Sequence, residues 1–90
     1  MDFEWDSGKA AQNLAKHGVS FEEATTVMRD TLSVTSRDPD HSVEEERYIT
    51  FGTSTNGRFL SVSHAERGGR IRLISARVAT RSERKFYEEG

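Results

Sequence analysis

The sequence contains no cysteine, and this absence excludes several kinds of chemistry. A chain without thiols forms no disulfide, holds no Cys-ligated zinc or iron–sulfur cluster, and has no thiol nucleophile. Long apolar stretches are absent too, since no run approaches the roughly 18 residues that span a bilayer. The acidic beginning, Met1-Asp2-Phe3-Glu4-Trp5-Asp6, lacks the apolar segment of a secretory signal. We therefore expect a cytoplasmic protein that does not bind a membrane.

Apolar residues are scarce. They make up 33% of the 90 residues, and Leu, Ile, Val and Phe together contribute 18. A chain of this length forms one domain, so we expect residues 1–90 to fold as a single unit with a thin core. The formal net charge is only −2, so the self-repulsion that keeps many apolar-poor chains unfolded is weak.

The small net charge conceals two halves of opposite sign. Residues 1–46 carry 11 acidic and 4 basic side chains, whereas residues 47–90 carry 4 acidic and 9 basic ones. Ten of the 13 Lys and Arg residues are arginine, whose planar guanidinium matches the oxygens of a phosphate. The second half therefore favours an anionic ligand, although arginines that merely face solvent from strands would give the same composition.

Two short helices and a strand are predicted in the acidic half. A helix that Asp6 or Ser7 can cap runs to about His17, and Gly18 suits its left-handed stop. The capping box Ser20-Phe21-Glu22-Glu23 opens a second amphipathic helix that reaches about Asp30. Alternating apolar and polar residues over 32–36 predict a short strand.

Three further strands are predicted in the basic half, over 47–54, 58–66 and 70–78. Asn56-Gly57 and Gly68-Gly69 separate them, and each pair favours a two-residue turn with positive φ. A last capping box, Thr80-Arg81-Ser82-Glu83, opens a helix to about residue 89. The fold class is therefore α+β: two N-terminal helices, an antiparallel meander of about four strands, and a C-terminal helix.

The two turns predict the register of the meander. Thr55 would face Arg58, Phe51 would face Val62, and Val62 would face Ser75. The predicted core face, which the helices should cover, then carries Ile49, Phe51, Leu60, Val62, Ile71 and Leu73. The opposite face carries Tyr48, Thr50, Phe59, Ser61, Ser63, Arg72, Ile74 and Ala76.

Several blocks of the chain, in a fixed order, resemble one family. They are Phe3-Glu4-Trp5-Asp6, Lys16-His17-Gly18-Val19-Ser20-Phe21-Glu22-Glu23-Ala24, Glu46-Arg47-Tyr48, Glu66-Arg67-Gly68-Gly69-Arg70-Ile71-Arg72-Leu73-Ile74-Ser75-Ala76-Arg77, Ala79-Thr80, Glu83-Arg84 and Tyr87. With these blocks the chain resembles the BrnT family of bacterial type II toxins over essentially its whole length. The resemblance implies a RelE-like fold and a ribonuclease that cuts RNA and inhibits translation.

The resemblance also implies partners. A BrnA-like antitoxin with a DNA-binding segment would neutralise the toxin, and operator DNA would be bound only through that antitoxin. A dimer and a heterotetramer are both open.

A ribonuclease that uses no metal must activate the ribose 2′-hydroxyl, stabilise the pentacoordinate phosphorus and protonate the leaving oxygen. The catalytic candidates for these steps are His64, Glu66, Arg72, Arg77 and Tyr87. Arg67 and Arg70 flank a turn and are candidates for contact with phosphate. In the predicted register Arg72 points to the open face, whereas His64 and Glu66 point toward the helices.

Each candidate also has a structural interpretation. His64 equally suits a hydrogen-bonded side chain beneath a helix, Glu66 suits an ion pair with Arg47 across the strands, and Tyr87 suits packing. We expect neither a cofactor nor a metal ion, because the loop with Asp38, Asp40, His41 and Glu44 to Glu46 lacks the spacing of a known metal loop.

Two other functions remain open at this point. The chain could be a non-catalytic module that binds RNA or a partner as part of a toxin–antitoxin transcriptional regulator, because no unambiguous acid–base pair is visible. It could also contact DNA only inside such a complex. Cleavage of bare RNA would separate the enzyme from both alternatives.

Overall fold

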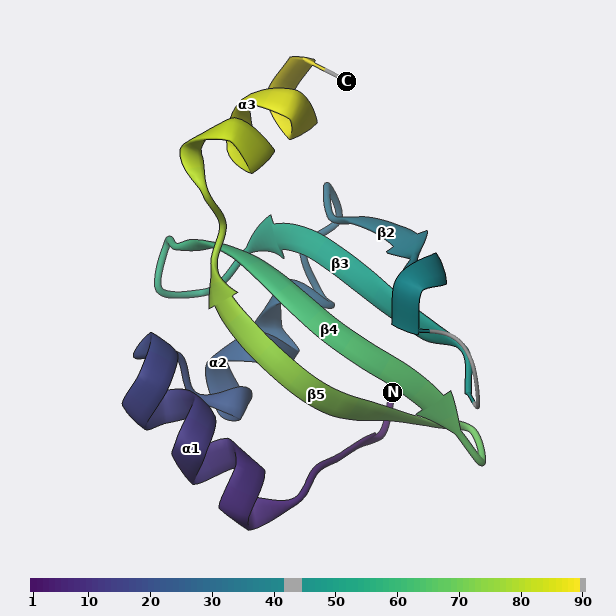
Figure 1. The fold of residues 1–90 in the computed structure, drawn as a ribbon. Helices are drawn as coiled ribbons and strands as arrows, with labels where there is room; N and C mark the ends of the chain where they lie inside the picture. Colours follow the sequence, from purple (N-terminus) through teal and green to yellow (C-terminus); the bar gives the residue numbers. More distant parts are fainter. Residues whose placement is uncertain (42–44, 90) are drawn as a thin grey trace.

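The computed structural model of the chain describes residues 1–41 and 45–89. In chain order the elements are β1 (Phe3–Glu4), α1 (Ser7–His17), α2 (Phe21–Val27), β2 (Val34–Arg37), the 3₁₀ turn η1 (Pro39–His41), β3 (Arg47–Thr53), β4 (Phe59–Arg67), β5 (Arg70–Val78) and α3 (Arg81–Glu89) (Figure 1). The predicted α+β class is confirmed. No helix in these two stretches has both the length and the apolar character needed to cross a membrane.

The strands form one sheet in the order β1-β5-β4-β3-β2. α1 packs on β5, and α2 packs across β3, β4 and β5, so both helices cover the same face (Figure 1). We call the other face, which these two helices leave uncovered, the open face. α3 follows β5 and stands apart from α1 and α2 at one end of the sheet.

β1 was not predicted, and it makes the sheet five-stranded and mixed rather than antiparallel throughout. It pairs in parallel with β5, placing Phe3 beside Ile71 and Glu4 beside Arg72. A strand of two residues is too short to show the alternation that identifies strands in a sequence. Long-range pairing with β5 is what orders it.

The helix ends follow the local signals. The Asp6 side chain accepts a hydrogen bond from the Lys9 amide at 2.9 Å, and Gly18 ends α1 at a φ of 68°. Ser20 caps α2 by accepting from the Glu23 amide at 3.0 Å. α2 ends at Val27, before the predicted limit of about Asp30, and the next three amides bond to carbonyls three residues back.

The hairpin between β3 and β4 differs from the predicted two-residue turn. The Gly57 amide donates to the Ser54 carbonyl at 2.9 Å, and the Ser54 amide donates to the Arg58 carbonyl at 2.8 Å. Three residues therefore form the loop, with Gly57 in the left-handed region at a φ of 78°. Thr55 consequently does not face Arg58.

The extra loop residue shifts the predicted register of β3 by one position. Phe51 lies opposite Ser61 rather than Val62, and Thr50 takes the place opposite Val62. Because strand side chains alternate between faces, the shift moves Phe51 and Ile49 from the predicted core to the open face. Thr50 is instead fully buried beneath the helices.

A β-bulge in β5 corrects the other predicted pairing. Arg67 pairs with Arg70 across the predicted two-residue turn, which is confirmed, and His64 pairs with Leu73. Beyond that point Ser63 pairs with Ser75, so Ile74 is an extra residue on β5. Val62 therefore lies opposite Ala76, and not opposite Ser75.

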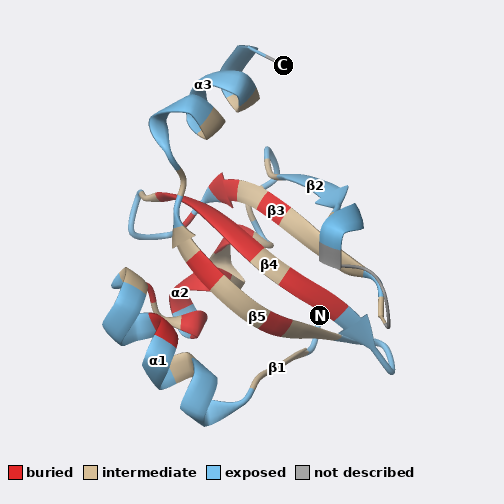
Figure 2. Ribbon diagram, viewed as in Figure 1, coloured by how far each residue is buried: buried red, intermediate tan, exposed pale blue. Residues whose placement is uncertain are grey.

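The core lies between α2, α1 and the helix-covered face. Figure 2 shows burial concentrated on β4 and α2, whereas β2 and most of α3 are exposed. The buried cluster consists of Val19, Phe21, Ala24, Val27, Leu60, Val62, Leu73 and Ala76, with Ile71 packed against it. Leu60, Val62, Ile71 and Leu73 thus confirm part of the predicted core.

Asn13 attaches α1 to β5 where no strand covers the edge of the sheet. Its side-chain amide donates to the Ala76 carbonyl at 2.8 Å, and its carbonyl accepts from the Ala76 amide at 3.0 Å. β1 ends at Glu4 and does not reach this part of β5. Asn13 therefore satisfies two buried backbone groups that would otherwise lack partners.

Candidate functional site

The bulge in β5 brings two candidate arginines to one face of the sheet. Arg72 lies opposite Ala65 and Arg77 lies opposite Ser61, so both project from the open face. They are five positions apart in the sequence, and in a regular strand this odd spacing would place them on opposite faces. Their partners on β4, Ala65 and Ser61, are four positions apart, so the two arginines are separated by roughly 13 Å along the sheet. Arg72 and Arg77 therefore line one surface but do not share one position.

Arg77 is held by a carboxylate from α3. Its Nη1 and Nη2 atoms donate to the two oxygens of Glu83 at 2.7 and 2.9 Å. The same carboxylate accepts from the Thr80 amide at 2.8 Å, and Thr80 Oγ1 accepts from the Glu83 amide at 3.1 Å. The predicted capping box is thus confirmed, and it also orients an arginine.

Glu83 is ionised at neutral pH. Hydrogen bonding to Arg77, the larger cause, together with the bond from Thr80, lowers the pKa of Glu83 to about 2. Glu83 is therefore a carboxylate that fixes a guanidinium, and it is unsuited to donate a proton near pH 7.

One edge of the Arg77 guanidinium remains available. Glu83 occupies the end of the group, and the Val78 carbonyl is 3.4 Å from Nη1. Among residues 1–41 and 45–89, none accepts a hydrogen bond from Nε–H, and the side chain is 41% exposed. The Nε–H and the second Nη2 hydrogen form a fork that can bind two oxygens of one phosphate.

The other arginines of the open face and of the β4–β5 turn are held differently. Arg72 donates to Glu4 of β1 at 3.1 Å, and its side chain is 25% exposed. Arg67 donates to Glu45 at 3.2 Å, and Arg70 is exposed across the turn from it. Arg72, Arg67 and Arg70 therefore lead away from Arg77 toward the opposite end of the sheet.

His64 lies on the other side of the sheet from these arginines. It is 7% exposed, and its Nε2 atom is 2.8 Å from Thr50 Oγ1, which in turn is 2.6 Å from Thr35 Oγ1. Its ring stacks on that of Tyr48 with centroids 5.8 Å apart. Burial lowers the pKa of His64 to about 4, so the ring is neutral at pH 7. This geometry favours the structural interpretation, and a catalytic role for His64 stays a prediction.

Glu66 is also separated from the open-face arginines. It is exposed and pairs with Ile71, whereas Arg47 lies opposite Ala65. The predicted placement of Glu66 across from Arg47 is therefore wrong by one residue, for the same reason as the register of Phe51. Arg47 instead approaches Glu45, with Nε and Oε1 3.6 Å apart.

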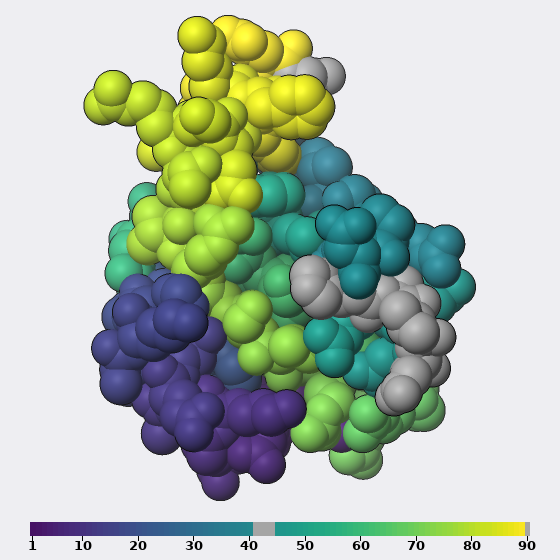
Figure 3. All heavy atoms as spheres, viewed as in Figure 1, coloured from purple at the N-terminus to yellow at the C-terminus, as the bar shows by residue number. Residues whose placement is uncertain are grey.

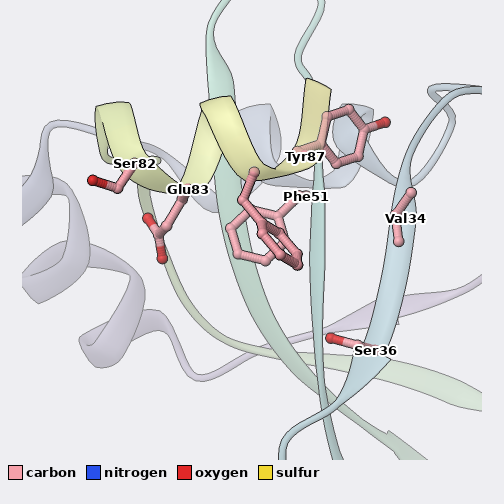
Figure 4. Close-up of a pocket in the computed structure, with 7 residues that line it drawn as sticks. Val34, Ser36, Phe51, Ser82, Glu83 and Tyr87 are labelled. Atoms are coloured by element: carbon pink, nitrogen blue, oxygen red, sulfur yellow. The ribbon is translucent and has the colours of Figure 1, made fainter. Parts of the chain in front are cut away.

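Tyr87 belongs to α3, one turn after Glu83, and its side chain packs on the end of the open face. Its ring is 4.8 Å from that of Phe59, and Phe59 stacks on Phe51 at 6.4 Å. Figure 4 shows Glu83 and Tyr87 on either side of Phe51, with β2 contributing Val34 and Ser36. Tyr87 and the Arg77–Glu83 pair thus lie at the same end of the open face with Phe51 between Glu83 and Tyr87, whereas His64 and Glu66 lie elsewhere.

A groove of about 560 Å³ occupies this end of the molecule. Its lining residues are Val34, Ser36, Phe51, Ser82, Glu83, Phe86 and Tyr87. In the space-filling view, α3 projects beyond the rest of the surface (Figure 3). The sequence did not predict Phe51, Phe86 or Glu83 as site residues. The capping box pointed to Glu83, but only the packing of α3 brings it to Arg77.

No cluster suited to a metal ion is present in the described part of the chain. Within residues 1–41 and 45–89, no three His, Asp or Glu side chains are grouped to hold one. The loop considered above includes Glu44, which lies outside the described residues. Metal independence therefore stays a prediction.

The fold is that of a known small α+β protein class. It matches the crystal structure of the Brucella abortus ribonuclease toxin BrnT with a TM-score of 0.67 and 23% sequence identity, over 90% of this chain and 99% of that chain. A search of curated proteins gave no match.

The family follows from the sequence match. Residues 5–83 match the family described as ribonuclease toxin, BrnT, of type II toxin-antitoxin system. The chain belongs to this BrnT toxin family, and the resemblance drawn from its sequence blocks is confirmed. Membership in a type II system implies an antitoxin partner.

Proposed function

We propose that this chain is an endoribonuclease that works without a metal ion and that binds the scissile phosphate at Arg77. The observation that carries the proposal is the Arg77 guanidinium, oriented by Glu83 and with one fork open on an exposed face. A donor fixed before the substrate arrives stabilises the charge of a pentacoordinate phosphorus without reorganising. The family, a ribonuclease toxin, agrees with this use of the site.

The remaining candidates take their roles from their places around Arg77. Tyr87 lies on α3 one turn after Glu83, and its hydroxyl would protonate the leaving oxygen. Arg72, Arg67 and Arg70 lie progressively farther along the surface and would contact neighbouring phosphates of the same strand. Such contacts position RNA without reading its sequence.

The same proposal includes the partners. A BrnA-like antitoxin would neutralise the toxin and would bring its own DNA-binding segment, so that operator DNA is contacted through the antitoxin. RNA cleavage would inhibit translation in the cytoplasm. A dimer and a 2:2 heterotetramer with the antitoxin both remain compatible with this role.

The test is cleavage of bare RNA in a chelator, with and without added divalent metal. We expect the wild-type protein to cut in chelator, and Arg77→Ala to lower the cleavage rate by roughly 10²-fold, as on removal of one preorganised donor. Arg77→Lys should restore part of the rate, because lysine lacks the bidentate fork. Arg29→Ala is the matched control, since Arg29 is an exposed arginine just beyond α2, whose helix covers the other face.

Two results would contradict the proposal. Cleavage only with Mg²⁺ would overturn metal independence, and an Arg77→Ala variant that cuts at the wild-type rate would remove Arg77 from the site. A folded wild-type protein that binds RNA but never cuts it would favour the alternative of a non-catalytic module. One observation favours that alternative: His64 is buried and turned away from the arginines.

A further inference from the structure

We propose that the groove beneath α3 binds an unpaired base of the RNA next to the phosphate held by Arg77. This inference rests on the proposed function, because it takes RNA as the ligand of the open face. It adds a second element of recognition, namely stacking of a base against aromatic side chains, to the electrostatic contact at Arg77.

The walls of the groove are aromatic and open to solvent. Phe51 and Tyr87 line it, and each packs against Phe59, at 6.4 and 4.8 Å between ring centroids. Phe86 also lines it and is 80% exposed, which is unusual for so large an apolar side chain. The volume of the groove, about 560 Å³, falls within the roughly 300–1,000 Å³ of small-molecule sites.

The charges at the rim suit a nucleic acid. Glu83, which lines the groove, is bonded to Arg77, so its negative charge is balanced and the Arg77 guanidinium lies one hydrogen bond away from the lining of the groove. Arg84 lies over the Phe59 ring, with its guanidinium carbon 5.7 Å from the centroid, and donates to Glu88 at 2.9 Å. A single strand that places a phosphate on Arg77 would thus meet a ring-lined recess close to that cation, the combination typical of single-strand binding.

The groove is lined mainly by apolar surface, and two hydroxyl groups among its lining residues can pair with the edge of a base. Ser36 and Ser82 line it, and within the described residues neither hydroxyl has a hydrogen-bond partner. Hydroxyls at the edge of a stacking site can pair with the edge of a base, whereas an apolar side chain would leave them unsatisfied. Charge complementarity and these hydroxyls together favour a nucleotide over a protein.

The probe for this site is a short 2′-O-methyl RNA strand, which has no 2′-hydroxyl to attack, carrying one 2-aminopurine. Stacking in the groove should quench its fluorescence on binding to the wild-type protein. Phe86→Ala should abolish the quenching and weaken binding about tenfold, the effect of losing one stacked base. Leu14→Ala is the matched control, because Leu14 is an exposed apolar residue on α1.

A base-free ribose-phosphate strand of the same length separates stacking from charge. Its affinity should be unchanged by Phe86→Ala and lowered by Arg77→Ala. Circular dichroism verifies the fold of each variant, and Phe86 is so exposed that its truncation removes little packing.

The outcomes distinguish this inference from the proposed function. Quenching by a protein that fails to cut ordinary RNA would refute only the cleavage and would leave the base site standing. Unchanged quenching and affinity in Phe86→Ala would overturn the base site. The base site would also be overturned if Phe86→Ala left RNA binding intact but abolished binding of a protein. That protein could be a second copy of this chain, measured by sedimentation, or the antitoxin.

Discussion

Glu83 has two roles at the scale of single residues, since it caps α3 and orients Arg77. Glu83→Gln keeps an acceptor for the cap but removes the charge that holds the guanidinium. We expect about a tenfold loss of kcat with RNA affinity nearly unchanged, which is smaller than the loss for Arg77→Ala because the donor remains. The cost in stability should stay below about 1 kcal/mol, because both side chains are partly exposed.

The control for Glu83 is Glu88→Gln on the same helix. Glu88 pairs with Arg84 at 2.9 Å, and both side chains are about 60% exposed. Single-turnover cleavage and RNA binding measured on both variants separate the effects. Equal kcat values for Glu83→Gln and Glu88→Gln would show that orientation of Arg77 does not matter.

His64 should make stability depend on pH. Burial lowers its pKa from 6.5 to about 4 in the folded protein, so the unfolded chain binds more protons between these values. The contribution of the neutral His64 ring to the free energy of unfolding is therefore present above pH 6.5 and is lost as pH drops toward 4. The loss is roughly 2 kcal/mol by pH 5. Urea unfolding at pH 7 and pH 5 measures this loss.

His64→Gln provides the comparison for this prediction. Glutamine can keep a hydrogen bond to Thr50 but does not titrate, so its unfolding midpoint should change much less between pH 7 and pH 5. The ion pair of Glu83 adds little to this difference, because its stabilisation is lost only as pH falls from the ordinary pKa of 4.5 toward about 2, which lies below pH 5. An equally steep pH dependence in the variant would assign the effect to other groups.

At the scale of elements, the register of β3 predicts different consequences for two apolar truncations. Leu73 is buried in the core beneath α2, so Leu73→Ala should cost about 2–5 kcal/mol. Phe51 lies half-buried on the open face against Phe59, and Phe51→Ala should cost less, about 1–2 kcal/mol.

Urea unfolding of the two variants tests this difference, with RNA binding measured on the same samples. Phe51→Ala should remain folded and bind RNA less tightly, because its ring lines the groove. If Phe51→Ala unfolds as readily as Leu73→Ala, the register with Phe51 in the core would be favoured instead.

α3 is attached to the sheet by few contacts. Arg77 bonds to Glu83, the rings of Phe59 and Tyr87 meet at 4.8 Å, and Arg84 lies over Phe59. No residue of α3 is fully buried, because its apolar side chains lie at the groove or in solvent. The element that completes the site is therefore also the one least supported by the core, and its loss would remove Glu83 and Tyr87 together.

At the scale of the whole molecule, the thin core and exposed edge suggest that a partner stabilises the fold. The buried cluster has eight residues, and all four residues of the edge strand β2 are exposed. The acidic first half offers a surface to a basic antitoxin segment. A partner that binds only the folded state raises the free energy of unfolding by about 4 kcal/mol when its free concentration is a thousand times Kd.

Thermal unfolding with and without the antitoxin tests this expectation. The complex should have a higher Tm, and the Tm should rise further with antitoxin concentration. An unrelated basic protein at the same concentration is the control for nonspecific charge effects. Identical Tm values far above the Kd would exclude stabilisation by the antitoxin.

Local features were predictable from the residues. The caps at Ser20 and Thr80, the stop at Gly18 and the turn at Gly68-Gly69 all appear as expected, because each depends on neighbours within a few positions. The family, too, could be recognised from blocks in the chain. The candidate arginines could also be named from the sequence, because the affinity of a guanidinium for phosphate depends on the residue type.

Where those arginines point depended on contacts between distant segments. The three-residue loop at Gly57 and the extra residue Ile74 each shift a strand by one position, and each shift turns side chains to the other face. Neither is visible locally, because Asn-Gly also suits a two-residue turn and a bulge has no strong sequence signal. Packing of α1, α2 and β1 against the sheet selects between such registers, and so places Arg72 and Arg77 on one surface and His64 on the other.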